Sequence, residues 1–425
     1  MIGREVWGRI IRDFWEWDVK LIRRDISYDI PEVQRALTII GPRRAGKTYF
    51  MFQIIKDLLG QIDRRKIIFV NFEDPRLIDV NLDDLMEFLD VFYTIYPENV
   101  KETCYFFLDE VQCVENWERF VRFLLDRNQK VVVSGSSSKL LSKEITTHLR
   151  GRSIPVRIYP FSFREILKAN KIDFKPYFSS YELAKVKSLA EDYLMWGGYP
   201  EVVLSPSLRR DILREIVDLT IYRDVVERWG VENIRALRLI LKMLAYSSHL
   251  SISKIYRNLK GLGLSVGKNT VANYVEYLED SLVVYRLHAL VKSYKKAELL
   301  GFKPYLVDNG ILHVLGVEDR GRLLENLVFV ELLKKRYAPE DIFYYTFDGG
   351  EVDFVVDEQL IQVCYDMGDY DTRMREIKAL SRASKDLGCK DCLILTWDQE
   401  ETVSENGLTI RVTPVWKWCL GSECN

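Results

Sequence analysis

The chain has 425 residues, of which 48% are hydrophobic and 29% charged, as in ordinary globular proteins with more than one domain. Its 61 Lys and Arg residues nearly balance 63 Asp and Glu residues, so the net charge of -2 excludes a protein that is basic over its whole surface. The first twenty residues mix charged and apolar side chains, which argues against a signal peptide, and no segment has the apolar length of a membrane helix. We therefore expect a cytoplasmic protein without membrane contact.

The first predicted element with a chemical role is a buried strand, Ala36–Ile40, followed by a loop and a helix from Lys47 to Leu59. The loop matches the phosphate-binding pattern G-x-x-x-x-G-K-[ST], known as Walker A, at every fixed position. The helix N-terminus binds phosphate through its free N–H groups, Lys47 faces the β- and γ-phosphates, and Thr48 offers its hydroxyl to Mg²⁺. We expect ATP to be held by the whole loop: Gly41, Pro42, Arg43, Arg44, Ala45, Gly46, Lys47 and Thr48.

A second apolar strand, Cys104–Glu110, ends on two carboxylates, as the Walker B pattern requires. Asp109 is the expected Mg²⁺ ligand, and Glu110 is placed to polarise the attacking water as a general base. A strand that merely ends in solvated acids is the alternative, and the Walker A loop upstream makes it the weaker one.

Two further strands, Lys66–Val70 and Lys130–Val133, are separated from the others by helical segments, which predicts a parallel sheet. Ligands bind at the carboxyl ends of such strands. We therefore expect Asn71, Asp109 and Ser136 to lie together at the edge of the sheet where the nucleotide binds.

The segments GPRRAGKT, FFLDE, VSGSSSKLLSKE, LRGR and YPFSFRE resemble the archaeal and bacterial ATPases of the AAA+ type, and the resemblance covers essentially the whole chain. It implies an α/β fold with a P-loop parallel sheet and a helical lid, followed by a winged helix and a restriction-endonuclease-like domain. It also implies that Asn71 is the switch residue that restrains Glu110, and that Ser136 or Ser137 senses the γ-phosphate.

The same resemblance implies that Arg150 or Arg152 reaches the γ-phosphate, where an arginine neutralises charge in the transition state. If this arginine comes from a neighbouring subunit, catalysis requires a homo-oligomer. The alternative is an Arg-Gly-Arg surface turn before a strand, and the sequence does not decide between them.

The middle of the chain is predicted to be helical from about residue 163 to 231, with a break at Trp196–Pro200. Residues 236–307 then read as helix, turn, helix and a two-stranded hairpin, which is the order of a winged helix. Residues 251–300 contain eight Lys or Arg residues and four Asp or Glu residues, which gives this segment a net charge of +4.

This local charge favours a DNA-binding face, and a winged helix used only for protein packing is the alternative. The candidate DNA contacts are Lys254, Lys268 and Asn269 on the helices, and Lys292, Lys295 and Lys296 between the strands.

The C-terminal part resembles the restriction-endonuclease-like fold, whose active members carry an Asp and then Glu-x-Lys on the next strand. Glu325 and Asp353 match the acids of that pattern, but Gln362 stands in place of the Glu and Cys364 in place of the Lys. An amide is a poor Mg²⁺ ligand and a thiol offers no cation, so we predict that nuclease chemistry is absent.

We thus expect an N-terminal helical arm (1–35), an ATPase core (36–165), a lid (166–235), a winged helix (236–307) and an inactive nuclease-like domain (308–425). The predicted function is a Mg²⁺-dependent ATPase that binds DNA in recombination, repair or mobile-element processes; the alternative is an ATP-dependent switch that controls a protein partner. Four cysteines near the end are read as reduced thiols or as a zinc or disulfide site: Cys389, Cys392, Cys419 and Cys424.

Overall fold

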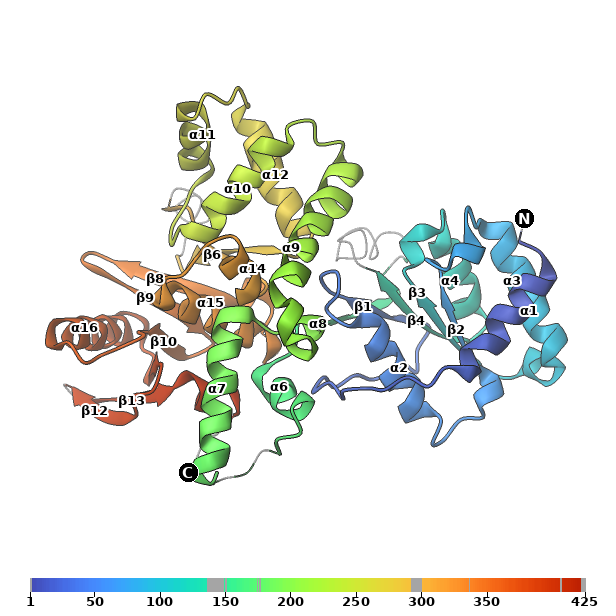
Figure 1. The fold of residues 1–425 in the computed structure, drawn as a ribbon, viewed down its shortest axis with the longest axis horizontal. Helices are drawn as coiled ribbons and strands as arrows, with labels where there is room; N and C mark the ends of the chain where they lie inside the picture. Colours follow the sequence, from blue (N-terminus) through green and yellow to red (C-terminus); the bar gives the residue numbers. More distant parts are fainter. Residues whose placement is uncertain are drawn as a thin grey trace. The chain divides into compact units, whose positions relative to one another are not determined.

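A computed structural model of the chain describes residues 2–135, 149, 151–173, 175, 177–291, 300–335, 337–405 and 407–421. By its internal contacts the chain divides into two compact units, Met1–Tyr159 and Pro160–Asn425 (Figure 1). Each unit is described by itself.

The first unit is built on a parallel sheet whose strand order is β2-β3-β4-β1-β5 in the described residues. Every neighbouring pair of strands in it is parallel, as the alternation of strands and helices predicts. Its strands are β1 (Ala36–Ile40), β2 (Ile67–Asn71), β3 (Tyr105–Asp109), β4 (Lys130–Gly135) and β5 (Ser153–Arg157). Its helices are α1 (Arg4–Asp13), α2 (Lys47–Leu58), α3 (Leu82–Ile95) and α4 (Trp117–Asp126).

Both faces of this sheet are covered, which explains why its strands are apolar almost throughout. Successive strand residues point to opposite faces, so Phe106 and Leu108 join one core cluster and Phe107 the other. The first cluster includes α1, α3 and α4, and the second includes α2. The four predicted strands and the helix after the Walker A loop are confirmed within a few residues.

The N-terminal arm is not a separate helical domain, which corrects our expectation. Only α1 and a short 3-10 turn at Phe14–Glu16 are helical, and the chain from residue 17 to 31 is extended. Trp7 of α1 is fully buried against Phe88 of α3, with ring centroids 5.1 Å apart. The arm therefore belongs to the hydrophobic core of the first unit.

The second unit begins with helices, as predicted, and the break at Trp196–Pro200 lies between α7 and α8. The helices before the first strand are α6 (Phe163–Ala169), α7 (Ser180–Trp196), α8 (Pro200–Leu204), α9 (Arg209–Leu219), a π-helix (Thr220–Glu227), α10 (Ile234–Tyr246), α11 (Ile252–Gly261) and α12 (Lys268–Asp280). Later helices are α14 (Asn309–Val314), α15 (Arg320–Lys334), α16 (Tyr370–Leu387) and α17 (Val415–Cys419).

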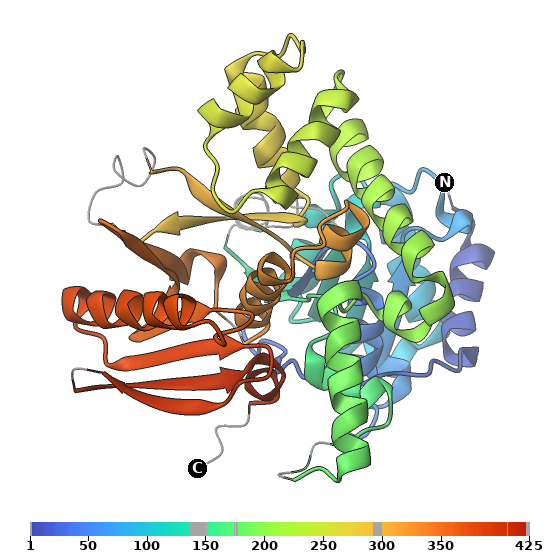
Figure 2. The ribbon, with the colours of Figure 1, turned by 60° about the vertical axis from the view of Figure 1, so that its left-hand side comes forward.

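A mixed sheet of order β12-β13-β11-β10-β9-β8-β6-β7 forms the rest of this unit in the described residues (Figure 2). Its strands are β6 (Val284–Ala289), β7 (Phe302–Leu306), β8 (Ile342–Phe347), β9 (Gly350–Val356), β10 (Gln359–Val363), β11 (Asp391–Thr396), β12 (Glu401–Glu405) and β13 (Leu408–Pro414). α16 covers one face of its central strands and contributes Ile377 and Leu380 to the core.

The β6–β7 hairpin, which we expected as the wing of a separate domain, is part of this same sheet. β6 pairs with β7 in the antiparallel sense and with β8 in the parallel sense, through His288 opposite Phe343. The expected boundary between residues 307 and 308 therefore does not separate two bodies.

The segment of α7 and α8 is joined to the C-terminal part of the second unit by buried polar contacts. Asp308 accepts the N–H of Gly198 at 2.7 Å, and a Cβ on Gly197 would lie 1.8 Å from the same carboxylate. Tyr193 of α7 donates its hydroxyl to Glu331 of α15. Across the described ranges, no helix combines the length and the hydrophobicity needed to cross a membrane.

Candidate active site

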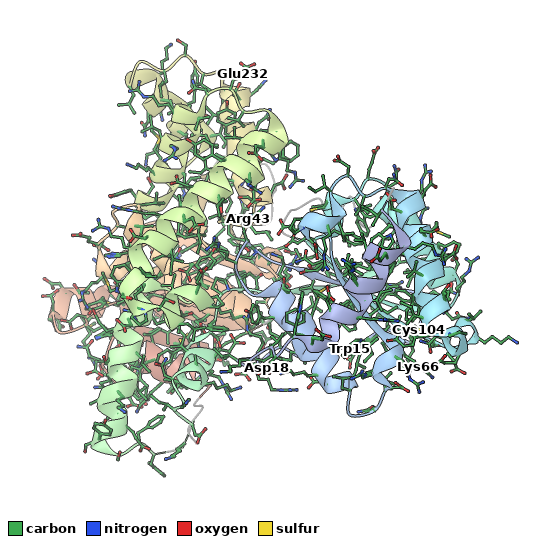
Figure 3. The ribbon with its side chains drawn as sticks, turned by 45° about the vertical axis from the view of Figure 1, so that its right-hand side comes forward. Trp15, Asp18, Arg43, Lys66, Cys104 and Glu232 are labelled. Carbon is green, nitrogen blue, oxygen red and sulfur yellow. The ribbon has the colours of Figure 1, made fainter. Side chains whose placement is uncertain are left out.

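The Walker A loop leaves the carboxyl end of β1 and leads directly into α2, as the motif requires. A Cβ on Gly41 would lie 2.1 Å from the backbone oxygen of Ile158, so only glycine fits there. Gly46 has φ +96° and precedes the first residue of α2, so a side chain would strain the turn into the helix. Figure 3 labels Arg43 on this loop, and Lys66 and Cys104 just before β2 and β3, at the amino ends of their strands.

Lys47 is 5% exposed, and its ammonium group lies inside the curve of the loop. The Nζ atom donates to the backbone oxygens of Gly41 and Pro42, each at 3.2 Å. The helix N-terminus and the ammonium group thus offer positive charge at the same place, which is the electrostatic requirement of a phosphate site.

Thr48 and Asp109 lie in contact although 61 residues separate them in the chain. The Thr48 hydroxyl donates to Asp109 Oδ2 at 2.7 Å, and the Ser134 hydroxyl donates to Asp109 Oδ1. Burial and the neighbouring Glu110 carboxylate raise the pKa of Asp109 to about 6, while the two hydroxyls oppose this rise. These oxygens suit Mg²⁺, which commonly takes one or two protein carboxylates together with phosphate oxygens.

Glu110 follows at the end of β3 with φ +51°, a backbone conformation that is uncommon outside glycine and that turns the chain sharply after the strand. Its carboxylate Oε2 accepts the side-chain N–H of Gln112, and its backbone N–H points to Ser134 Oγ at 3.4 Å. Ser134 and Gln112 were missed by the sequence reasoning. Their signal was positional: one ends β4 beside Asp109, and the other follows Glu110 by two residues.

Asn71 ends β2 directly opposite Asp109 in the strand register, so the sheet brings it to the same edge as predicted. Its Oδ1 atom accepts the backbone N–H of Glu73 at 2.8 Å. The Glu110 carboxylate accepts a hydrogen bond from Gln112 rather than from Asn71. The role of Asn71 as a switch stays a prediction.

Arg24 is a further residue that the sequence reasoning missed. It is 6% exposed, and its guanidinium donates to the backbone oxygen of Ala45 at 3.0 Å and of Tyr159 at 2.6 Å. Its backbone N–H donates to Gln53 of α2 at 2.7 Å. The arm thereby holds the Walker A loop, and no sequence motif announces this contact.

The predicted sensor and arginine positions are placed only in part. Ser136, Ser137 and Arg150 lie outside the described residues. Arg152 precedes β5, and its backbone oxygen accepts the N–H of Ala36 at the start of β1. Since the Walker A loop follows the end of β1, Arg152 lies at the opposite edge of the sheet. Contact with the γ-phosphate bound to its own subunit is therefore excluded, and only a role in a neighbouring subunit stays a prediction.

Three of the candidate DNA contacts are exposed on the second unit: Lys254 on α11, and Lys268 and Asn269 at the start of α12. Lys292, Lys295 and Lys296 lie outside the described residues. Arg257 and Lys260 of α11 are also exposed.

The acids of the predicted nuclease-like site also come together, but with a cation that the sequence reasoning did not anticipate. Lys303 of β7 is 2% exposed, and its Nζ atom lies 2.8 Å from Asp353 Oδ1 and 3.2 Å from Glu325 Oε1. Burial alone would lower the pKa of Lys303, but the carboxylates outweigh it and hold the pKa well above its usual range. Cys364 supplies no positive charge to this site, but Lys303 supplies one from β7; the absence of nuclease chemistry stays a prediction.

Cys389, Cys392 and Cys419 are free thiols, and Cys424 lies outside the described residues. Nowhere in the described ranges do three or more His, Cys, Asp or Glu side chains form a group able to hold a metal ion. The described cysteines therefore behave as reduced side chains.

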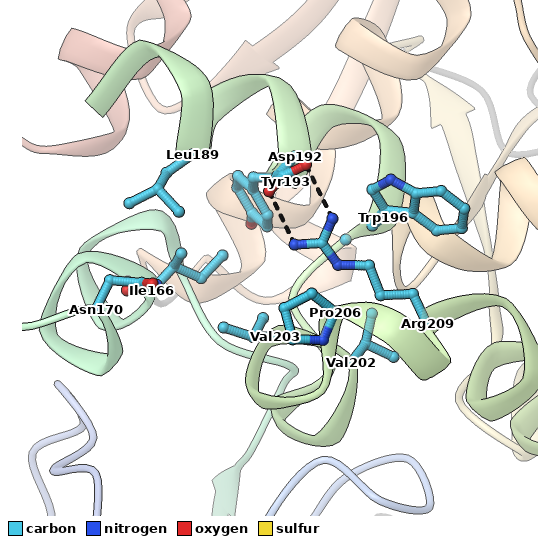
Figure 4. Close-up of a pocket in the computed structure, with 11 residues that line it drawn as sticks. Ile166, Asn170, Leu189, Asp192, Tyr193, Trp196, Val202, Val203, Pro206 and Arg209 are labelled. Atoms are coloured by element: carbon cyan, nitrogen blue, oxygen red, sulfur yellow. Dashed lines mark hydrogen bonds and ion pairs between the residues drawn. The ribbon is translucent and has the colours of Figure 1, made fainter. Parts of the chain in front are cut away.

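A pocket of about 230 Å³ lies among α6, α7, α8 and α9 of the second unit (Figure 4). Trp196, Tyr193 and Val202 line it, together with an ion pair in which both terminal nitrogens of Arg209 bind Asp192 at 2.8 and 2.9 Å. Because this guanidinium is already neutralised, the pocket does not offer the unpaired positive charge of a phosphate site.

Comparisons with known proteins agree with the architecture of the first unit. Residues 33–167 match a family described as an AAA domain. Residues 187–321 and 320–418 match two families described as domains of unknown function, DUF8612 and DUF4143. Among solved structures, the Walker-type ATPase PABY2304 of Pyrococcus abyssi covers 75% of this chain and 96% of its own, at 13% identity and a TM-score of 0.44.

Two relatives align along most of the chain. The Methanocaldococcus jannaschii protein MJ1544, described as uncharacterized, is 37% identical over 417 residues, which are 94% of this chain and 91% of the relative. A Haemophilus influenzae protein described in the same way is 31% identical over 345 residues, covering 77% of this chain and 82% of the relative. The chain therefore belongs to the same family as these archaeal and bacterial proteins, and its amino-terminal part has the P-loop ATPase fold of an AAA domain.

Proposed function

We propose that this protein is a Mg²⁺-dependent ATPase that converts ATP and water to ADP and phosphate. The observation that carries the proposal is the contact between Thr48 and Asp109, 2.7 Å between hydroxyl and carboxylate oxygens, directly beside the Walker A loop. Two separate motifs thereby meet at one point, with Glu110 next in the chain. A loop that only bound phosphate would need neither carboxylate.

Each side chain has a distinct part in this proposal. Lys47 and the N–H groups at the start of α2 bind and orient the β- and γ-phosphates. Glu110 takes a proton from the attacking water, and Gln112 fixes the direction of its carboxylate through the hydrogen bond to Oε2. Thr48 and Asp109 would hold Mg²⁺, which neutralises charge on the phosphate oxygens when it is bound.

The proposal is tested by ATP turnover and ATP binding measured on the same preparations. Lys47→Ala is expected to abolish nucleotide binding or turnover, because the charge facing the phosphates is lost. Glu110→Gln is expected to keep ATP binding and to lower turnover by about 10²–10⁴-fold, the usual contribution of a general base. Hydrolysis at the parent rate in Glu110→Gln would show that another group activates the water.

We further propose that the exposed basic face of α11 and α12 binds the phosphate backbone of DNA. The support is the exposure of Lys254, Arg257, Lys260 and Lys268 on adjacent helices of a segment with net charge +4. Such contacts are electrostatic and weaken steeply with salt.

DNA binding and ATPase rate should therefore be measured together at low and high salt. The double variant Lys254→Ala, Lys268→Ala is expected to bind DNA more weakly. The slope of the logarithm of the binding constant against the logarithm of the salt concentration should fall in magnitude by about 2, since each lost phosphate contact reduces it by about 1. Lys187→Ala, which removes an exposed lysine paired with Asp398, is the matched control. Absence of both salt-sensitive DNA binding and DNA-stimulated turnover would favour an ATP-dependent switch that acts on a protein partner.

A further inference from the structure

The second unit contains an acidic cluster, defined here as Glu325, Glu351 and Asp353, that converges on a single buried lysine. Lys303 Nζ lies 2.8 Å from Asp353 Oδ1, 3.0 Å from Glu351 Oε1 and 3.2 Å from Glu325 Oε1. The three acids come from α15 and β9, and the lysine comes from β7. The ammonium group thus stands where three carboxylates meet, which is the position that a divalent cation takes in a carboxylate site.

The oxygens of Asp353 are already engaged. Oδ1 accepts from Lys303, and Oδ2 accepts the backbone N–H of Val363 at 3.0 Å. Asp353 is 7% exposed, so water does not readily replace these partners. A metal ion at this carboxylate would have to displace the ammonium group first.

The Oε1 atom of Glu325 is engaged in the same way, and a cation faces Oε2 at a longer distance. Oε1 accepts from Lys303 and from the hydroxyl of Tyr305 at 2.5 Å. Oε2 lies 3.9 Å from a terminal nitrogen of Arg322 on the preceding turn of α15. Two cations therefore face this one carboxylate from both sides.

Gln362, which stands where the nuclease pattern has a second acid, does not offer its oxygen either. Its Oε1 atom accepts the backbone N–H of Asp353 at 3.2 Å, and its Nε2 atom donates to Glu376 at 2.6 Å. The amide thus links β9 and β10 to α16. An acid at this position would place a second negative charge beside Glu376, so the amide fits the structural role.

The residues present therefore do not fit the Mg²⁺ ion that the restriction-endonuclease resemblance implies. We propose that the Lys303 ammonium group takes the place of that metal ion, so that the acidic cluster is a metal-independent ion-pair network around a buried lysine, with Glu351 at its exposed side. Three acids from two elements are then held to β7 by a cation that is part of the chain, and the cluster has a structural role.

The inference is tested by titrating Mn²⁺ with the full chain. Binding is measured as the loss of the electron paramagnetic resonance signal of free Mn²⁺. All variants carry Asp109→Asn and are measured without nucleotide, so that the proposed ATP site does not contribute. The unmodified cluster is expected to bind no Mn²⁺, and adding Asp353→Asn is expected to change nothing. Saturable binding that Asp353→Asn abolishes would overturn the inference.

Lys303→Met gives the complementary test, because it removes the cation and keeps an apolar side chain of similar length. We expect it to gain a Mn²⁺ site that Asp353→Asn removes, and to melt at a higher temperature with Mn²⁺ than without it. Lys187→Met, an exposed lysine of the same unit, should show neither change. A folded Lys303→Met that gains no Mn²⁺ site would contradict the proposal; if it does not fold, the titration of the unmodified cluster decides.

Discussion

Asp109 of the first unit and Asp353 of the acidic cluster in the second unit are both buried carboxylates on strands, but different groups offset their negative charges. Asp109 is met by two neutral hydroxyls, from Thr48 and Ser134. Asp353 and Glu325 are met by the ammonium group of Lys303. Hydroxyls leave the negative charge in place for an arriving cation, whereas an internal ammonium group neutralises it. The same residue type thus prepares one site for a ligand and closes the other.

The largest expected difference between the two sites appears when the aspartate of each is replaced by asparagine. Asp109→Asn should lower ATPase kcat/KM by about 10²–10³-fold, because several kcal/mol of metal-based charge stabilisation are lost. Asp353→Asn should leave turnover at the parent rate, since that cluster holds no catalytic group. Steady-state kinetics over a range of Mg²⁺ concentrations checks both, and an equal loss in the two variants would remove the distinction between the sites.

A smaller effect is expected from the arm that supports the Walker A loop. Arg24→Ala removes two buried hydrogen bonds from a charged donor, and bonds of this kind contribute about 1.5–3 kcal/mol each. We expect KM for ATP to rise about tenfold, the equivalent of about 1.4 kcal/mol, with a lower melting temperature. Arg23→Ala is the neighbouring control, because that exposed residue forms an ion pair with Asp57 away from the Walker A loop and should change KM little.

Gln112 offers a test within the first site. Its removal frees the Glu110 carboxylate from a hydrogen-bond donor, and a typical hydrogen bond contributes about 0.5–1.5 kcal/mol. We expect Gln112→Ala to lower kcat by about 2–10-fold, because the Glu110 carboxylate loses the hydrogen bond that fixes its direction toward the attacking water. The effect must vanish in the Glu110→Gln background. A change in KM alone would assign Gln112 to nucleotide binding instead.

The smallest effect concerns a third buried carboxylate, Asp308, which accepts hydrogen bonds from the backbone N–H groups of Gly198 and Gly310. Burial raises its pKa from 3.8 to about 6. A raised carboxyl pKa means that its stabilising contribution is complete below about pH 4 and is lost as the pH rises through 6. The free energy of unfolding, measured with denaturant at several pH values, should fall between pH 4 and pH 6 in the parent protein. It should depend less on pH in Asp308→Asn. Identical slopes would show that Asp308 does not titrate in this range.

The first unit could be predicted from the sequence because its information is local. Walker A and Walker B are short motifs at strand ends, and apolar strands between helical segments define a parallel sheet. Ser134 and Gln112 were missed because nothing in their residue type distinguishes them from other polar residues near a strand end. Arg24 was missed because its contacts bridge 21 and 135 residues of sequence.

The second unit was harder to predict from the sequence, because its charged cluster depends on contacts between residues far apart in the chain. Pattern reasoning placed Glu325, Asp353 and Gln362 on the correct elements and Cys364 one residue beyond the end of its strand, but it looked for a cation only two residues beyond Gln362. Lys303 lies 50 residues before Asp353, on a strand assigned to a different domain. Only the pairing of β6 with β8 brings that strand into the same sheet, and no local signal announces a parallel pair of two residues.

The β6–β7 hairpin, which belongs to the same sheet as β8 to β13, also limits how this chain can recombine with its relatives. β6 and β7 fall within the stretch matched by one domain family, while β8 to β13 fall within the other. A genetic exchange at residue 320 would combine Lys303 and β6 from one parent with the three acids and β8 from another. The two halves must therefore change in step, so recombination between relatives should preserve residues 284–356 as one block even where the flanking helices diverge.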